Sequence, residues 1–100
     1  RMRTAEITMR SNVGKYIYST IANNKNIKRV VEIGSGSGNG STVCIVRGLN
    51  THVTKDTKFV CMEPVKSHYN DLLGRIQRSG ANWIEHHNNS SISFDRLSIK

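Results

Sequence analysis

The stretch Val31-Glu32-Ile33-Gly34-Ser35-Gly36-Ser37-Gly38-Asn39-Gly40-Ser41-Thr42 decides the fold of this chain. Before it, the β-branched run Arg29 to Ile33 predicts a buried parallel strand. After it, the apolar run from Ser41 to Leu49 predicts a buried helix, although periodicity alone leaves a strand open. The glycines between these runs allow positive φ and leave the main chain bare, so a ligand can lie against it.

The region before this stretch contains a predicted helix from about Val13 to Asn23. Ser11 or Asn12 is suited to cap its first turn. Its apolar face follows a spacing of three and four residues and comprises Val13, Tyr16, Ile17, Thr20 and Ile21. The asparagine-rich segment that follows favours a turn, because asparagine side chains bond readily to their own backbone.

The region after the stretch repeats the alternation of strand and helix. Lys58 to Met62 is a predicted strand, and Pro64 suits the first position of the next helix. Gly80 is placed to end that helix in the left-handed conformation. Asn82 to Glu85 is a shorter predicted strand around an aromatic and an aliphatic residue.

Strands that alternate with helices form βαβ units and a parallel sheet. We therefore predict an α/β fold, a Rossmann-like three-layer α/β/α arrangement of which only the first three strands are recognisable. Residues 1–100 are expected to form a single, partial domain, with residues 1–27 as an N-terminal helix and its lead-in. Because the chain begins with Arg1, we expect it to be a piece of a longer protein. The tail Ile92 to Leu97 alternates like a strand, whereas Ser91 would equally suit the start of a helix.

The spacing of the glycines separates three kinds of ligand loop at the carboxyl end of the first strand. A phosphate-binding P-loop ends in Gly-Lys-Ser or Gly-Lys-Thr, but here Gly40 is followed by Ser41 and no lysine is near. A dinucleotide loop requires GxGxxG, and its third glycine would fall on Asn39 or Ser41. The pattern that fits is an acidic residue followed by alternating glycines, namely Glu32, Gly34, Gly36 and Gly38.

This pattern resembles the first motif of class I S-adenosylmethionine-dependent methyltransferases, and the resemblance spans about Val30 to Asn89. It implies that S-adenosyl-L-methionine is the cofactor and that Glu32 holds its α-amino group. Glu63, at the end of the second strand, occupies the position that binds the two ribose hydroxyls. The βαβ geometry of nucleotide-binding folds independently places an acidic residue there.

The resemblance implies a cofactor-binding set of Glu32, Gly34, Ser35, Gly36, Gly38, Ser41, Glu63 and Asn88. Adenine would lie against the polar stretch His86 to Ser90, from which we select Asn88 as the candidate contact. No single position in this stretch matches the family cleanly. The catalytic residues and the acceptor atom are not recognisable. The ending Gly40 to Thr42 looks like that of small-molecule methyltransferases, so a small-molecule methyl acceptor is expected.

Both acidic residues have structural alternatives. Glu63 could serve only as an acid near a helix N-terminus, and Glu32 could form a surface salt bridge. The whole chain also has two alternative functions. One is an NAD(P)-binding oxidoreductase-type Rossmann domain with a degenerate loop, and the other is a non-catalytic basic domain that binds nucleic acid.

Composition narrows these choices. Fifteen Lys and Arg against seven Asp and Glu give a net charge of +8. The basic residues are scattered and do not alternate with aromatic residues, so nucleic acid is not favoured as a partner. Cys44 and Cys61 lie in apolar runs without CxxC spacing, which indicates a reducing, cytoplasmic compartment. The histidines predict no metal site, and no apolar run is long enough to cross a membrane.

Overall fold

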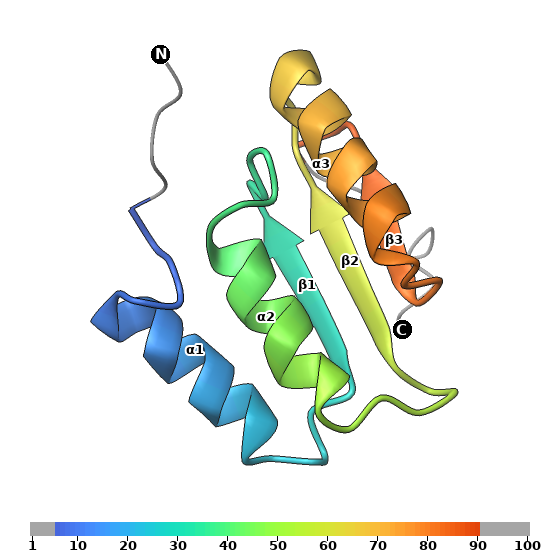
Figure 1. The fold of residues 1–100 in the computed structure, drawn as a ribbon. Coiled ribbons are helices and arrows are strands. Elements are labelled where there is room, and N and C mark those ends of the chain that lie inside the picture. The colour runs from blue at the N-terminus through green and yellow to red at the C-terminus, as the bar shows by residue number, and fades with distance from the viewer. Residues whose placement is uncertain (1–5, 91–100) are drawn as a thin grey trace.

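A computed structural model describes residues 6–90 of the chain and shows helices alternating with parallel strands (Figure 1). The elements in chain order are α1 (Asn12–Ala22), β1 (Arg29–Ile33), α2 (Ser41–Asn50), β2 (Lys58–Met62), α3 (Lys66–Ser79) and β3 (Ile84–His87). The predicted tail from Ile92 to Leu97 lies outside the described residues.

The strands form a parallel sheet in the order β1-β2-β3, with Val30 opposite Phe59 and Phe59 opposite Ile84. Paired residues of parallel strands share a face of the sheet. These side chains pack together with Ile45, Leu49 and Leu72 from α2 and α3 in one hydrophobic core. The predicted α/β class with a parallel, Rossmann-like sheet is confirmed, and the described residues form the sheet and a helical layer on it.

Strand β1 corrects one sequence prediction. A buried strand was predicted, yet the side chains of Val31 and Ile33 are 41% and 70% exposed. Within residues 6–90, β1 is an edge of the sheet, and α2 covers only the face that carries Val30 and Glu32. Its β-branched composition is that of a central strand, but among the described residues no element lies over its other face.

Helix α1 has the predicted length, and only part of its predicted apolar face is buried: Ile17 and Ile21 pack into the core. Ser11 caps it as predicted, because its hydroxyl accepts the backbone N–H of Gly14 at 3.0 Å. Val13 and Tyr16, predicted to belong to the apolar face, are 54% and 72% exposed. The helix packs against α2 rather than directly on the sheet, and this contact selects the side of the helix that carries Ile21.

Two boundaries on the carboxyl side of β2 also differ from prediction. Pro64 precedes α3 instead of opening it, because Val65 is extended and forms the N-cap. Strand β3 begins two residues later than predicted and continues to His87, since the backbone N–H of Glu63 donates to the His87 carbonyl at 3.0 Å. Gly80 ends α3 as predicted, with a left-handed φ of 71°.

Within residues 6–90, no helix is both long enough and apolar enough to cross a membrane.

The contact between α1 and α2 yields a test of the fold. A Cβ on Gly48 would lie 2.8 Å from Ile21 Cβ and 3.2 Å from the Tyr18 carbonyl oxygen. Because both groups belong to a packed helix interface, we expect Gly48→Ala to lower the free energy of unfolding by about 1–3 kcal/mol. Urea denaturation followed by circular dichroism measures this change.

Gly74 in α3 provides the matched control. A Cβ there would meet only the flexible guanidinium of Arg78, at 3.1 Å. Gly74→Ala should therefore stabilise the chain by up to about 1 kcal/mol through its higher helix propensity. Equal effects of the two substitutions would contradict the packing of α1 on α2.

Candidate functional site

The glycine loop lies at the carboxyl end of β1 and owes its shape to three left-handed glycines. Gly34, Gly36 and Gly38 have φ values of 79°, 63° and 84°, a region that other residues enter only at a cost. A Cβ on Gly34 or Gly36 would meet open space, whereas one on Gly38 would lie 2.8 Å from Leu72 Cδ1. Gly34 and Gly36 therefore leave the backbone uncovered, and Gly38 lets the loop pack on α3.

Glu32 ties β1 to the first turn of α2. Its buried carboxylate accepts hydrogen bonds from the hydroxyls of Ser41 and Thr42, the latter at 2.6 Å. The carboxylate also lies at the N-terminal end of a helix, where the helix dipole favours a negative charge. The alternative of a surface salt bridge is wrong, because Glu32 is buried and bonds to hydroxyl groups.

Glu63 ties the same loop to the end of β2. Its Oε1 accepts the backbone N–H of Gly36 at 2.7 Å, and its Oε2 accepts that of Val65 at 2.8 Å. The side chain is nearly fully buried, and the Nδ1 atom of His68 lies 4.0 Å from Oε2. Because each carboxylate oxygen has a second lone pair, Glu63 can accept two further hydroxyl groups while it holds the loop.

The other predicted site residues take different positions. Gly34 and Ser35 both donate their backbone N–H to the Met62 carbonyl, at 2.8 and 2.9 Å. The buried Ser35 hydroxyl lies near the thiol of Cys61; burial raises the pKa of that thiol, and the hydroxyl, as a hydrogen-bond partner, partly lowers it again. The hydroxyl bonds to no oxygen or nitrogen atom among the described residues. Asn88 follows β3 at the same carboxyl end of the strands. Its amide donates to the carbonyls of Glu63 and Pro64, at 2.8 and 3.2 Å. Its role toward adenine stays a prediction.

Thr42 and His68 are the two residues at this site that sequence reasoning did not identify. Thr42 was predicted as part of the loop motif and of the apolar helix, without a role in the site, although a hydroxyl pair that follows a glycine loop is a signal of helix-end hydrogen bonding. His68 was treated as isolated, and its approach to Glu63 follows from the turn between β2 and α3. No sequence spacing announces that approach.

Cys61 lies directly beneath the loop, opposite Glu32 in the register of β1 and β2. Burial raises the pKa of its thiol to about 12, because the low-polarity surroundings disfavour the thiolate. Cys61 and Cys44 are fully buried and unpaired, as expected of small core residues. The part of the chain that the structure describes contains no cluster of three His, Cys, Asp or Glu side chains suited to a metal ion.

Comparison with known proteins identifies similar solved structures. No protein-family model matches the chain, and no curated protein sequence matches it. A methyltransferase from Geobacter sulfurreducens is similar with a TM-score of 0.61 and 15% identity, over 83% of this chain and 41% of that one. A Plasmodium falciparum protein described as a protein-L-isoaspartate O-methyltransferase, in complex with S-adenosyl-L-homocysteine, is similar with a TM-score of 0.59 and 21% identity.

These similarities establish the fold. The second alignment covers 89% of this chain and 44% of the Plasmodium protein, so the chain spans about two fifths of the length of both structures. The predicted resemblance to the class I methyltransferase family is therefore confirmed for the fold. The three-stranded unit with its glycine loop corresponds to one part of these larger chains.

Thr42 yields a test of the carboxylate anchor. Thr42→Val keeps the shape of the side chain but removes the hydroxyl that donates to Glu32. Because a buried carboxylate oxygen then loses a donor, we expect the free energy of unfolding to fall by about 1–3 kcal/mol. Urea denaturation measures it, with Thr20→Val on the exposed side of α1 as the control. Equal stability of the two variants would refute the anchor.

Cys61 yields a test of the buried base of the loop. With its pKa raised to about 12, the folded thiol is protonated at pH 8, and protonated thiols do not attack disulfide reagents. In a Cys44→Ala background, we expect Ellman's reagent to label Cys61 at least about a hundredfold more slowly in the folded chain than in urea. Rapid labelling of the folded chain would show that the thiol is accessible and ionised.

Proposed function

We propose that this chain is the cofactor-binding portion of an S-adenosylmethionine-dependent methyltransferase. One observation carries the proposal. Two buried carboxylates, Glu32 and Glu63, stand at the carboxyl ends of adjacent parallel strands and flank a loop whose glycine backbone faces open space. Ligands of open parallel sheets bind at this end of the strands.

The chemistry of the loop fits a cationic nucleoside better than a phosphate-bearing one. S-adenosylmethionine has no phosphates, and the loop contains no lysine. Glu63 has free acceptor capacity for two ribose hydroxyls, and a bidentate acceptor of this kind gives orientation as well as affinity. We assign the α-amino group of the methionine moiety to the side of the loop that Glu32 anchors, with direct or water-mediated contact.

The chain's own residues would bind and orient the ligand. When bound, S-adenosylmethionine supplies an electrophilic methyl group on its sulfonium. Gly34 and Gly36 would let the ligand approach the backbone, Ser35 and Ser41 would line that approach, and Asn88 would face adenine. Positioning of this kind contributes much of the rate of a group-transfer reaction.

The acceptor and the cellular compartment extend this proposal. The Gly40 to Thr42 ending supports a small-molecule acceptor, and the acceptor site would belong to a longer protein. Among the solved structures, the Plasmodium protein is in complex with S-adenosyl-L-homocysteine, which supports the assignment of the cofactor type. The two unpaired buried cysteines support a reducing, cytoplasmic location.

Calorimetry of the full chain tests the proposal. We expect S-adenosyl-L-homocysteine to bind and NAD to show no heat of binding. Glu63→Ala and Glu63→Gln should each weaken binding more than about tenfold, because a charged acceptor in a buried place is lost. Asp56→Asn is the matched control, since Asp56 is exposed and precedes β2 at the opposite end of the sheet.

Three outcomes would contradict it. Binding of NAD alone would favour the oxidoreductase alternative. Affinity for a DNA or RNA oligonucleotide that falls steeply with salt, with no binding of S-adenosyl-L-homocysteine, would favour the nucleic-acid alternative. Unchanged affinity in a Glu63 variant would show that the carboxylate does not bind the ligand.

A further inference from the structure

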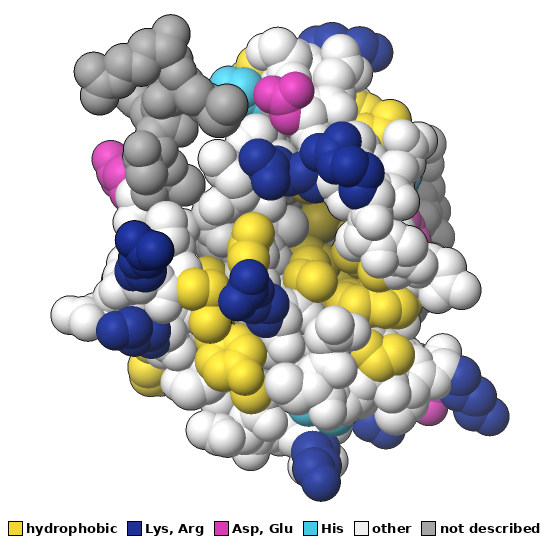
Figure 2. Space-filling model, viewed as in Figure 1, with side chains coloured by type: hydrophobic (Ala, Val, Ile, Leu, Met, Phe, Trp, Pro, Cys, Tyr) yellow, Lys and Arg dark blue, Asp and Glu magenta, His cyan; other side chains and the backbone are white. Residues whose placement is uncertain are grey.

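A hollow between α2 and α3 adjoins the proposed ligand site, because Gly38 of the loop and Thr42 of α2 also line it. Figure 2 shows apolar side chains gathered there, in the middle of a face whose other side chains are largely basic or uncharged. Its apolar lining comes from Val43 and Val46 of α2, Leu72 and Ile76 of α3, and Ile84 of β3. Helix α2 packs on α1 and α3 packs on β3, so the two helices stand apart and leave this lining open.

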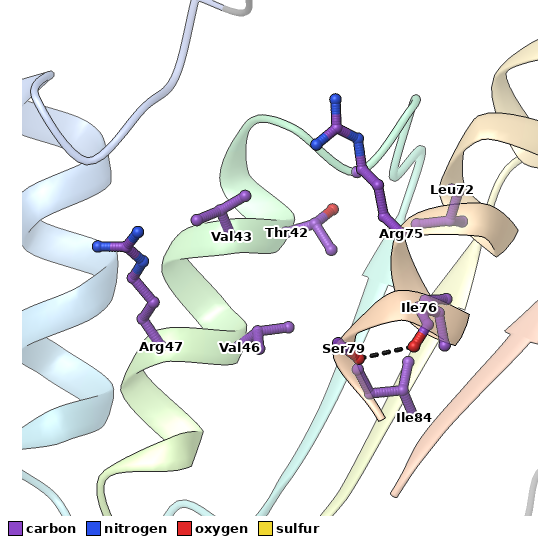
Figure 3. Close-up of a pocket in the computed structure, with 10 residues that line it drawn as sticks. Thr42, Val43, Val46, Arg47, Leu72, Arg75, Ile76, Ser79 and Ile84 are labelled. Carbon is purple, nitrogen blue, oxygen red and sulfur yellow. Dashed lines mark hydrogen bonds between the residues drawn. The ribbon is translucent and has the colours of Figure 1, made fainter. Parts of the chain in front are cut away.

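Two arginines flank the hollow. Arg47 and Arg75 line it from opposite walls, and both side chains are exposed. Among the described residues, neither guanidinium forms a hydrogen bond or an ion pair. Figure 3 shows that they point apart, Arg47 toward α1 and Arg75 toward the glycine loop. Two observations agree with this view. Arg47 also lines a second hollow, together with Tyr18 of α1. The Cδ atom of Arg75 would lie 3.4 Å from a Cβ on Gly38.

We infer that this hollow, the α2–α3 groove, binds an acidic amphipathic helix of a partner protein. Apolar side chains of that helix would contact Val46 and Ile76, and two of its carboxylates would pair with Arg47 and Arg75. The inference does not depend on the proposed function, because the groove shares only Gly38 and Thr42 with the loop and neither carboxylate lines it.

The shape of the groove favours a helical occupant. Val43 and Val46 are three residues apart in α2, and Leu72 and Ile76 are four apart in α3. Side chains at these spacings form ridges along each helix, and the side chains of another helix can pack into the groove between such ridges. Amphipathic helices that bind in apolar grooves use anchors at the same spacing.

The charges determine the character of the partner. Guanidinium groups that point apart need two separate anionic groups, which a single-headed fatty acid does not supply. A second copy of this chain is also unsuited. Of its seven acidic residues, Glu32 and Glu63 are buried at the loop, so seven minus two leaves five, against fifteen Lys and Arg. Electrostatic complementarity therefore selects an acidic protein segment.

Selection from a phage-displayed library of helical peptides tests the inference on the full chain. The library would randomise both the apolar face and the charged flanks of the helix. We expect the selected peptides to carry Asp or Glu beside apolar residues at i, i+3 or i+4, and i+7. In NMR spectra they should shift the methyl signals of Val43, Val46 and Ile76. Selection of no peptides, of Lys-rich peptides, or of peptides that shift other methyl groups would overturn the inference.

Charge reversal provides the matched test. In fluorescence anisotropy, Arg47→Glu combined with Arg75→Glu should weaken the selected acidic peptide by at least about tenfold and favour a peptide whose acids are replaced by lysine. Lys25→Glu combined with Lys55→Glu, in the exposed turns after α1 and α2, changes the net charge by the same amount; this control should change the affinity less than about twofold. Equal losses in the double variant and the control would reduce the effect to net charge and overturn the proposed groove.

Oleate, phosphatidylglycerol vesicles and self-association are the competing occupants. Displacement of the selected peptide by oleate or by such vesicles would point to a lipid. Dimerisation that the double charge reversal abolishes would point to a second copy of the chain. Either result would overturn the proposal of an acidic helix. Binding of S-adenosyl-L-homocysteine to the double variant, measured in parallel, separates failure of the groove from failure of the proposed function.

Discussion

The carboxylate of Glu63 is the constraint on which the rest of the site depends. It is buried at the end of β2, where an unpaired charge would cost several kcal/mol, and two backbone N–H groups compensate for this cost. One belongs to Gly36 in the loop after β1, and the other to Val65 just before α3. A single side chain thus joins the loop to the turn after the neighbouring strand. Because β1 and β2 are parallel, these connections lie at the same end of the sheet.

Glu32 and Glu63 hold the loop in complementary ways. Glu32 bonds to hydroxyl groups of the first turn of α2 and determines where the helix begins. Glu63 bonds to main chain and determines where the middle of the loop lies. Between these anchors, left-handed Gly34 and Gly36 turn the backbone without side chains that would fill the space beside it. These hydrogen bonds hold the loop in place without a ligand, which would reduce the entropy cost of binding the proposed cofactor.

The sequence predicted the order of helices and strands, the loop, the Gly80 stop and the location of Glu63, because each depends on local chemistry or on the regular geometry of a βαβ unit. It failed where a neighbour in space decides. Val31 and Ile33 have the composition of a buried strand, yet β1 is an edge of the described sheet. Val13 and Tyr16 fit the same helical stripe as Ile17 and Ile21, but packing on α2 buries only the part of the stripe that carries Ile17 and Ile21. Asn88 lies at the predicted carboxyl end of the strands, but its amide donates to two backbone carbonyls, and no sequence spacing predicts these hydrogen bonds.

The distribution of charge explains how one small basic chain can present two unlike surfaces. The net charge of +8 creates a long-range field that repels a cation such as S-adenosylmethionine. At physiological ionic strength that field is screened over about 8 Å, whereas Glu32 and Glu63 line the loop itself and are buried, so their charges are screened far less. Attraction at the loop is therefore local. The exposed Arg47 and Arg75 have the same sign as the long-range field, so both would favour the approach of the proposed acidic helix to the α2–α3 groove.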